Sequence, residues 1–174
     1  ALLNAHAPRL RAGPVSWRWI NAFYVYPNTL EAVRLTGAQV LDVLEHAARY
    51  YDGLSCPAEG GCTVITDPDI PHYNVDNLAG INYRIDPTRP EGSRILDPRY
   101  EGLPIDLHAE FTLVCNSYRT AGGGHFPHLD TAEVVWRSSK EMADLIGDYL
   151  NNHRPWRPTV DGNWHIGREL SAEE

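Results

Sequence analysis

Positive charge is scarce in this sequence, which carries 15 Lys and Arg residues against 23 Asp and Glu residues and has a net charge of −8 at pH 7. Proteins that bind nucleic acid without regard to its sequence need a basic face that neutralises the phosphates. The acidic balance therefore argues against a protein that binds a nucleic-acid duplex.

Long apolar runs are absent as well. A helix that crosses a membrane needs about 20 consecutive apolar residues, and no segment of this chain approaches that length. The first residues, "ALLNAHAPRL", lack the basic segment and the following apolar stretch of a secretory signal peptide. We therefore predict no membrane span, and no signal peptide is visible.

Cysteine is also rare, with three in the chain and no Cys-x-x-Cys pair of the kind that a zinc ribbon needs. Cys56 and Cys62 enclose the loop-like segment "CPAEGGC", and Cys115 lies in the apolar run "FTLVC". Two cysteines in a Pro/Gly loop suit a short disulfide in an oxidising compartment. Two free thiols are the alternative, and both interpretations stay open. We expect Cys115 to be a small core residue.

What the sequence does contain is enough apolar material for one folded domain. Its hydrophobic fraction is 43% and it has five tryptophans, a composition typical of folded globules rather than of disordered segments. A chain of 174 residues fits a single domain with a sizeable core. We therefore treat residues 1–174 as one domain.

The pattern of apolar residues predicts alternating short strands and two main helices. Segments rich in aromatic and β-branched residues are expected to be strands, and they span 17–26, 28–35, 80–86, 110–118 and 132–138. A long loop with several Pro and Gly residues is expected at 51–71.

Both helices have a predicted start. Thr36 with Gln39 forms a capping-box pattern, and the apolar residues that follow share one helical face. Ser138 with Glu141 has the same pattern ahead of the second helix, which should end before Pro155. Together these elements predict an α+β fold, a single compact domain with a mixed β-sheet and two main helices.

The stretch "NSYRTAGGGHFP" (116–127) needs an explanation of its own. Three consecutive glycines cost backbone entropy on folding and add no side chain to a core. Either the chain turns there in a way that other residues cannot, or something lies close to the backbone. A phosphate-binding loop would need Gly-Lys-Ser/Thr running into a helix, but Pro127 follows here, and three glycines do not make the dinucleotide pattern GxGxxG.

The histidines after the glycines invite a metal interpretation. His125 and His128 are spaced as HxxH, with Asp130 beyond, and the segment is faintly similar to the Gly-His-x-His motif of two-metal phosphatases. HxxH is not HxH, however, and Pro127 argues against a regular helix that presents both imidazoles. We therefore predict no metal ligand and no catalytic residue in this chain.

The remaining interpretation is the wall of a ligand pocket. Glycines let a flat ligand approach the backbone, and Tyr118, near the end of a predicted strand, can offer a ring face. A nucleobase suits such a surface, because stacking on an aromatic ring contributes about 1–3 kcal/mol per base. On these residues alone, a half-buried packing role for Tyr118 stays open.

Four longer motifs, taken in order, resemble one protein family. They are "YPNTLEAVRLTGAQVLDVLEHAA" (26–48), "YNVDNLAGINYRID" (73–86), "NSYRTAGGGHFP" (116–127) and "DGNW" (161–164). Together they resemble the C-terminal domain of the bacterial 5′-nucleotidase family, and especially its branch of bifunctional 2′,3′-cyclic-nucleotide 2′-phosphodiesterase/3′-nucleotidases. The resemblance extends over nearly the whole chain.

The resemblance implies that this domain binds the nucleoside part of a nucleotide. In the family the base lies between two aromatic rings, which correspond here to Tyr26 and Tyr118. Asn28 would contact the edge of the base.

Two further contacts are implied by position. Gly122, Gly123 and Gly124 would make room for the ligand beside the second ring. Arg9 takes the place of a substrate-contacting arginine, although "NAHAPR" (4–9) lacks the three glycines that precede this arginine in 5′-nucleotidases.

The resemblance also implies partners and a location. Family enzymes carry an N-terminal two-metal phosphoesterase domain in the same polypeptide, so divalent metals are expected there and no cofactor in this chain. The isolated chain is expected to be inactive. The family's usual export implies a periplasmic, secreted or cell-wall location. A surface around 17–26 that missing sequence would normally cover is expected to favour self-association.

Two alternatives carry the same motifs. One is a stand-alone nucleoside-binding or surface module without an enzyme partner, and the other is the substrate-binding domain of a 5′-nucleotidase. The preferred base and the position of the substrate phosphate also stay open, because stacking tolerates any base and the phosphate would lie in the other domain.

Overall fold

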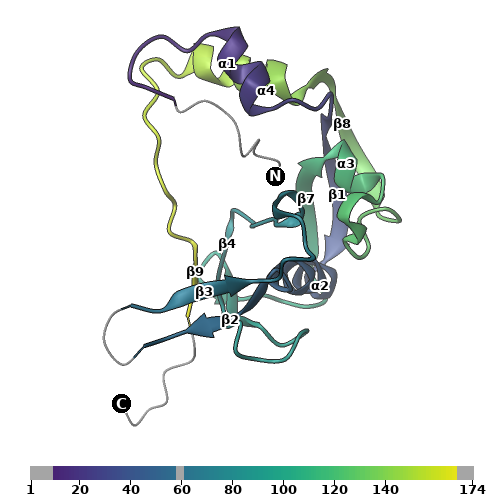
Figure 1. The fold of residues 1–174 in the computed structure, drawn as a ribbon. Coiled ribbons are helices and arrows are strands. Elements are labelled where there is room, and N and C mark those ends of the chain that lie inside the picture. Colours follow the sequence, from purple (N-terminus) through teal and green to yellow (C-terminus); the bar gives the residue numbers. More distant parts are fainter. Residues whose placement is uncertain (1–9, 58–60, 168–174) are drawn as a thin grey trace.

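The computed structural model describes residues 10–57 and 61–167 (Figure 1). The helices are α1 (Trp17–Phe23), α2 (Gly37–Ala48), α3 (Ser117–Thr120) and α4 (Met142–Asn152), with the 3₁₀ turns η1 (His72–Asn74) and η2 (Gly123–His125). The strands are β1 (Thr29–Thr36), β2 (Tyr51–Ser55), β3 (Thr63–Thr66), β4 (Ile81–Ile85), β5 (Ile95–Tyr100), β6 (Leu103–Pro104), β7 (Glu110–Asn116), β8 (Glu133–Glu141) and β9 (Trp164–Ile166). None of the helices in these ranges has the length and apolarity to cross a membrane.

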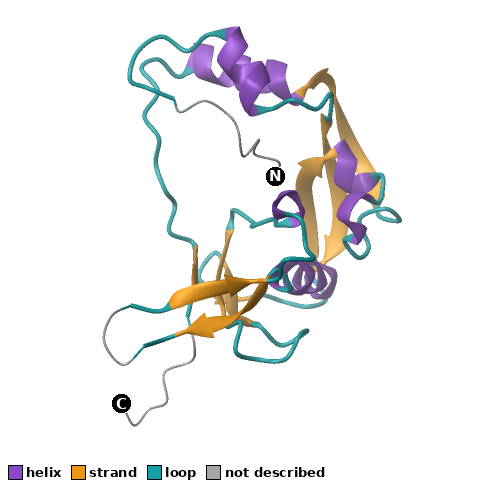
Figure 2. Ribbon diagram, in the orientation of Figure 1, coloured by secondary structure: helices purple, strands orange, loops and turns teal. Residues whose placement is uncertain are grey.

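Within the described residues the strands form three sheets (Figure 2). β1 lies between β7 and β8 and is antiparallel to both, and β2 pairs with β3. In the third sheet β4 lies between β5 and β9, with β6 beyond β5. This sheet is mixed, because β9 runs parallel to β4 and β5 runs antiparallel to it. The α+β fold with two main helices, α2 and α4, is confirmed.

The hydrophobic core lies where α2 meets β1 and β4. Its largest fully buried side chains include Val33, Leu35, Val40, Leu44 and Ile85. Phe126 and Leu129, which follow the three glycines, are each 2% exposed and belong to the same core. The glycine segment, residues 122–128, is therefore anchored on the core at its C-terminal end.

The start of α2 has the predicted capping box. The Thr36 hydroxyl accepts from the Gln39 N–H (3.3 Å), and the Gln39 side chain accepts from the Thr36 N–H (2.8 Å). The Gly37 N–H donates to the Ala109 carbonyl (3.0 Å), so the loop before β7 closes on the helix start. A Cβ atom on Gly37 would collide with the Asp106 carbonyl. Glycine follows the capping threonine because this loop passes so close.

The prediction of a strand at 17–26 is wrong, because Trp17–Phe23 form helix α1. Ser16 caps this helix, and its hydroxyl accepts a backbone N–H of the first turn (3.3 Å). The Trp17 ring packs on α4 at Gly147, where a Cβ atom would collide with it. Aromatic residues favour strands by propensity, but contact with α4 decides the conformation. The surface around 17–26 that is expected to favour self-association is therefore formed by helix α1, which lies beside α4 (Figure 1).

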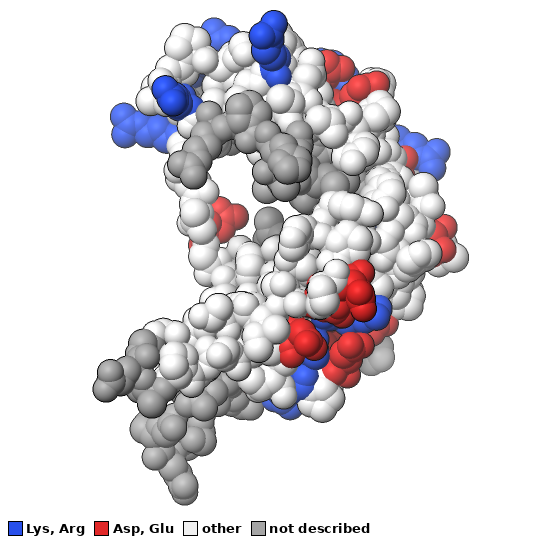
Figure 3. All heavy atoms as spheres, viewed as in Figure 1, with Lys and Arg blue, Asp and Glu red and all other residues white. Residues whose placement is uncertain are grey.

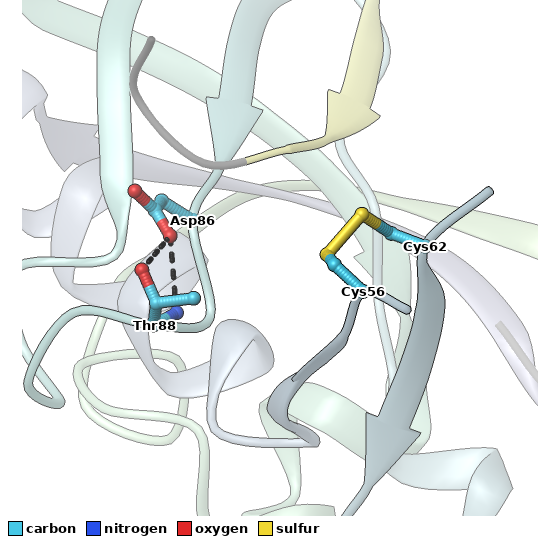
Figure 4. The surroundings of a disulfide bond; sticks show 4 residues. All are labelled: Cys56, Cys62, Asp86 and Thr88. Carbon is cyan, nitrogen blue, oxygen red and sulfur yellow. Dashed lines mark hydrogen bonds between the residues drawn. A yellow bond between two sulfur atoms is a disulfide. The ribbon is translucent and has the colours of Figure 1, made fainter. Parts of the chain in front are cut away.

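The segment 51–71, predicted to be a loop, contains the hairpin of β2 and β3. Cys56 and Cys62 lie just beyond the paired strand ends and are joined by a disulfide, with their Cα atoms 4.2 Å apart (Figure 4). The disulfide alternative is confirmed. Pro57 and Gly61, which suggested a loop, lie between the two cysteines at the hairpin tip.

Removing this disulfide is expected to lower the free energy of unfolding by about 2 kcal/mol, because closing so short a loop restricts the unfolded chain only a little. Urea unfolding of a Cys56→Ser/Cys62→Ser variant, compared with the parent protein, measures the loss. Cys115, expected to be a core residue, is only partly buried and lies outside the core cluster. Burial raises the pKa of its free thiol to about 11, so it should alkylate slowly at neutral pH. Mass spectrometry should count one free thiol, and a count of three would contradict the bridge.

The second helix begins later than predicted. β8 continues through Ser138 to Glu141, and α4 starts at Met142 without a side-chain cap from Glu141. The Ser138 hydroxyl accepts from the Lys140 N–H instead (3.0 Å). β8 pairs with β1 at Arg137 and at Glu141, on both sides of Ser138, and this pairing carries the strand past the residues that resemble a cap. The helix ends before Pro155, as predicted.

Candidate functional site

The three glycines reverse the chain between a short helix and a buried phenylalanine. β7 ends at Asn116, whose side-chain oxygen accepts from the Arg119 N–H (3.2 Å) and so starts α3. The strand predicted over 110–118 therefore ends two residues early, and Tyr118 lies in this helix. Gly122 and Gly124 have φ values of 86° and 75°, which is left-handed backbone that favours glycine.

Gly123 lies against the ring of Tyr118. A Cβ atom on Gly123 would stand 2.5 Å from Cε1, Cε2 and Cζ of that ring. Because these three atoms are equally distant, the glycine backbone lies over a face of the ring and not at its edge. No residue with a side chain fits there without moving the ring. Tyr118 is still partly exposed, so it retains surface that a ligand can reach.

Arg119, a residue that was not predicted from the sequence, binds the glycine segment through a buried side chain. Its side chain is 2% exposed. It donates to the Asp76 carboxylate from Nε (2.6 Å) and Nη2 (3.1 Å). Nη1 donates to the Asn74 side chain (3.1 Å) and the Gly123 carbonyl (3.0 Å), and Nη2 also donates to the Tyr73 carbonyl (2.9 Å).

The carboxylate that pairs with Arg119 stays ionised. Burial by itself would raise the pKa of Asp76, but hydrogen bonds from Arg119 hold that pKa below its ordinary value. Two of the recognised motifs, 73–86 and 116–127, thus meet at one buried ion pair. Asp76 and Arg119 each lie within a motif, but they are 43 positions apart, so the sequence pattern does not indicate that they pair.

Helix α2 supports the glycines from the core. His46 Nε2 lies 2.9 Å from the Gly124 carbonyl oxygen, and the His46 ring centroid is 4.6 Å from that of Phe126. Burial lowers the pKa of His46, although the bond to Gly124 partly opposes it. We assign the ring proton to Nε2, because a carbonyl oxygen can only accept.

Tyr24 joins the two segments that are expected to hold the base. Its hydroxyl accepts from the amide of Asn28 (3.2 Å) and from that of Asn116 (3.1 Å). A backbone N–H at the start of β1 also donates to a hydroxyl of α3 (3.0 Å). The loop with Tyr26, which is 49% exposed, therefore lies beside the start of α3. That the rings of Tyr26 and Tyr118 face one another stays a prediction.

Arg9, predicted to contact the substrate, lies outside the described residues. The two histidines considered as metal ligands lie within them. His128 Nε2 is 2.7 Å from the Asp42 carboxylate, and His125 lies in η2. In residues 10–57 and 61–167, no group of three His, Cys, Asp or Glu side chains is placed to hold a metal ion.

A hollow of about 930 Å³ lies elsewhere, between the residues that precede α1 and the end of α4. Its lining is mainly apolar and includes Trp17, Ile20, Leu150 and Trp156. No residue predicted to bind the base lines it. On the coloured part of the face in Figure 3, Lys and Arg side chains stand in separate patches and form no continuous basic surface.

Residues 1–131 match the model of the family described as 5′-nucleotidase, C-terminal domain. The chain belongs to this family. The match includes β1, α2, the Asp76–Arg119 pair and the three glycines, but it ends before α4, whose residues line part of the hollow. The resemblance drawn from the four motifs is confirmed.

This 5′-nucleotidase C-terminal domain is 35% identical over 167 residues to the trifunctional nucleotide phosphoesterase protein YfkN of Bacillus subtilis (strain 168), a match over 89% of this chain and 11% of that protein. It is 30% identical over 170 residues to a 2′,3′-cyclic-nucleotide 2′-phosphodiesterase/3′-nucleotidase of Haemophilus influenzae, covering 88% of this chain and 26% of the relative.

A solved structure of a proposed 5′-nucleotidase from Staphylococcus aureus has the same fold, with a TM-score of 0.74 and 28% identity, over 86% of this chain and 29% of the other. The 5′-nucleotidase C-terminal domain therefore spans about a tenth to three tenths of the length of the proteins that it matches. The relatives carry phosphoesterase or nucleotidase names, so the family is one of hydrolases.

Proposed function

We propose that this domain recognises the nucleoside part of the substrate of a 2′,3′-cyclic-nucleotide 2′-phosphodiesterase/3′-nucleotidase. The base stacks between Tyr26 and Tyr118, and Asn28 lies at its edge. An N-terminal metallophosphoesterase domain of the same polypeptide, which holds the divalent metals, hydrolyses the phosphoester.

One observation carries this proposal. The loop of Tyr26 and the helix of Tyr118 are joined through the Tyr24 hydroxyl, while Gly123 covers part of one face of the Tyr118 ring. A ring backed by main chain on one side is a rigid platform, and rigid aromatic surfaces bind with a small loss of conformational freedom. The names of two of the relatives point to the same class of substrate.

The proposed setting is outside the cytoplasm. The disulfide between Cys56 and Cys62 supports it, because such bonds persist in oxidising compartments and are rare in reducing ones. We propose a periplasmic, secreted or cell-wall location for the protein that carries this domain.

Replacing either Tyr26 or Tyr118 with Ala should raise KM by about 5- to 150-fold, which corresponds to about 1–3 kcal/mol for stacking one base. The measurement uses the protein expressed from the complete reading frame that contains this chain, with 2′,3′-cyclic AMP, 3′-AMP and 5′-AMP as substrates. The value of kcat should change little, because stacking on the base is the same in the ground and transition states.

The matched control is Tyr100→Ala in β5. Tyr100 is 42% exposed, close to the 49% of Tyr26, but it lies in the sheet of β4, β5, β6 and β9 and not in the loop before β1. Its loss should leave KM unchanged. If KM is unchanged in both Tyr26→Ala and Tyr118→Ala, the proposed stacking is not used.

A further inference from the structure

Arg119 contacts the Tyr118 ring, the glycine that lies over a face of that ring and the 73–76 segment. All three guanidinium nitrogens donate hydrogen bonds, to acceptors in the 73–76 segment and to the Gly123 carbonyl. The central carbon, Cζ, lies 4.4 Å from the ring centroid of Phe126 and 5.3 Å from that of Tyr118. One buried side chain thus ties the ring, the glycine against it and a core phenylalanine to a separate segment of the chain.

This set of contacts needs the planar fork of arginine. A guanidinium presents five N–H donors in one plane and can bind a carboxylate with two of them while the others reach further acceptors. Lysine would carry the same charge but as a single point, which cannot meet Asp76 and the Gly123 carbonyl in this geometry. A Cβ atom on Gly124 would collide with Nη1, so the glycine segment is shaped around the guanidinium as well as around the ring.

We infer that Arg119 is a positioning residue for substrate binding: paired with Asp76, it holds Gly123 and Tyr118 in the arrangement that receives the base. The inference rests on the proposed stacking function and names a residue that does not itself touch the substrate. The 73–76 segment then belongs to the site through Arg119, although it carries none of the residues predicted to bind the base.

A second buried arginine provides the comparison that separates positioning from general stability. Arg94 is 7% exposed and donates to the carbonyls of Ala48 (3.2 Å), Tyr51 (2.9 Å) and Arg89 (3.0 Å). The hydrogen bond to Ala48 caps the C-terminal end of α2, and none of the three goes to the glycine segment. Loss of either arginine should lower the unfolding temperature, but only loss of Arg119 should disturb Tyr118.

The test measures KM, kcat and the unfolding temperature of Arg119→Met, Tyr118→Ala, their double variant and Arg94→Met, with 2′,3′-cyclic AMP and the protein from the complete reading frame. Arg119→Met should raise KM by about 5-fold or more, up to the rise in Tyr118→Ala, with kcat nearly unchanged. The double variant should have the KM of Tyr118→Ala alone, because Arg119 acts through that ring. Arg94→Met should lower the unfolding temperature and leave KM unchanged.

The outcomes distinguish the two proposals. An unchanged KM in Tyr118→Ala overturns this inference, and together with an unchanged KM in Tyr26→Ala it overturns the stacking function as well. A raised KM in Tyr118→Ala, together with a KM in Arg119→Met equal to that of Arg94→Met, overturns the inference alone. So does a double variant whose KM rise is the product of the two single rises. If Arg119→Met does not fold, Arg119→Lys takes its place under the same criteria, since it keeps the charge beside Asp76 and loses the fork.

Discussion

Incubated alone with 2′,3′-cyclic AMP, 3′-AMP or 5′-AMP and with Mn²⁺, Zn²⁺ or Co²⁺, the 174-residue chain is expected to release no phosphate. Two-metal phosphoester chemistry needs a cluster of ligands that holds metal ions about 3.5–4 Å apart, where they activate water and stabilise the developing charge. The described residues contain no group of three candidate ligands placed to hold even one ion.

The histidines of the glycine segment do not change this expectation. His128 lies against the Asp42 carboxylate at 2.7 Å, and His125 and His128 both have left-handed backbone, with φ values of 55° and 68°. The residues proposed to hold the base, Tyr26, Asn28 and Tyr118, include no general base, and a neutral tyrosine does not replace one.

The control for this prediction is the protein from the complete reading frame, which should hydrolyse at least one of the three nucleotides under the same conditions. Phosphate release that co-purifies with the short chain, and that disappears in a His125→Ala/His128→Ala variant, would contradict the prediction. It would make the glycine segment a catalytic site.

Replacing Gly124 with Ala should lower the free energy of unfolding by about 2–5 kcal/mol. The left-handed backbone at this position, with a φ of 75°, costs a residue with a side chain about 1–2 kcal/mol. A Cβ atom would also collide with the Arg119 guanidinium and approach the Asn74 side-chain oxygen to 2.7 Å, and overpacking of this kind costs about 1–3 kcal/mol. Urea unfolding measures the sum.

Gly92→Ala is the matched control, because it separates the two costs. Gly92 has a φ of 78°, and a Cβ atom there would meet nothing within 4 Å. Gly92→Ala should therefore lower the free energy of unfolding only by the cost of the left-handed backbone, about 1–2 kcal/mol. Equal losses in Gly124→Ala and Gly92→Ala would show that the glycine segment is not packed against Arg119, and the KM of Gly124→Ala would then stay at the value of the parent protein.

Local patterns predicted part of the fold well. The capping box at Thr36 and Gln39 joins residues three positions apart, and both of its hydrogen bonds are present. The apolar face that follows it is buried in the core. The cap predicted at Ser138 has the same local pattern but is overridden, because β8 pairs with β1 on both sides of it, at Arg137 and Glu141.

The motifs predicted the residues of the candidate site, namely the two tyrosines, Asn28 and the three glycines. They did not predict the hydrogen bonds that join these residues to the rest of the domain. Tyr24 was not predicted, because its role comes from Asn28 and Asn116, which lie 4 and 92 positions away from it. The Asp76–Arg119 pair was missed for the same reason, since its members come together only when the 73–76 segment folds against α3.

The sequence by itself determined the family, the α+β class and the elements whose stabilising contacts lie within a few residues, because those contacts depend only on neighbouring residue types. Tertiary structure decided the rest. Trp17–Phe23 became a helix because Trp17 packs on Gly147 of α4, and the β2–β3 hairpin formed because its strands pair and a disulfide joins their ends. Gly123 and Gly124 are glycines because a ring and a guanidinium from α3 occupy the space that their side chains would fill. Such contacts join residues that are distant in sequence, and spacing along the chain does not encode which of them will meet.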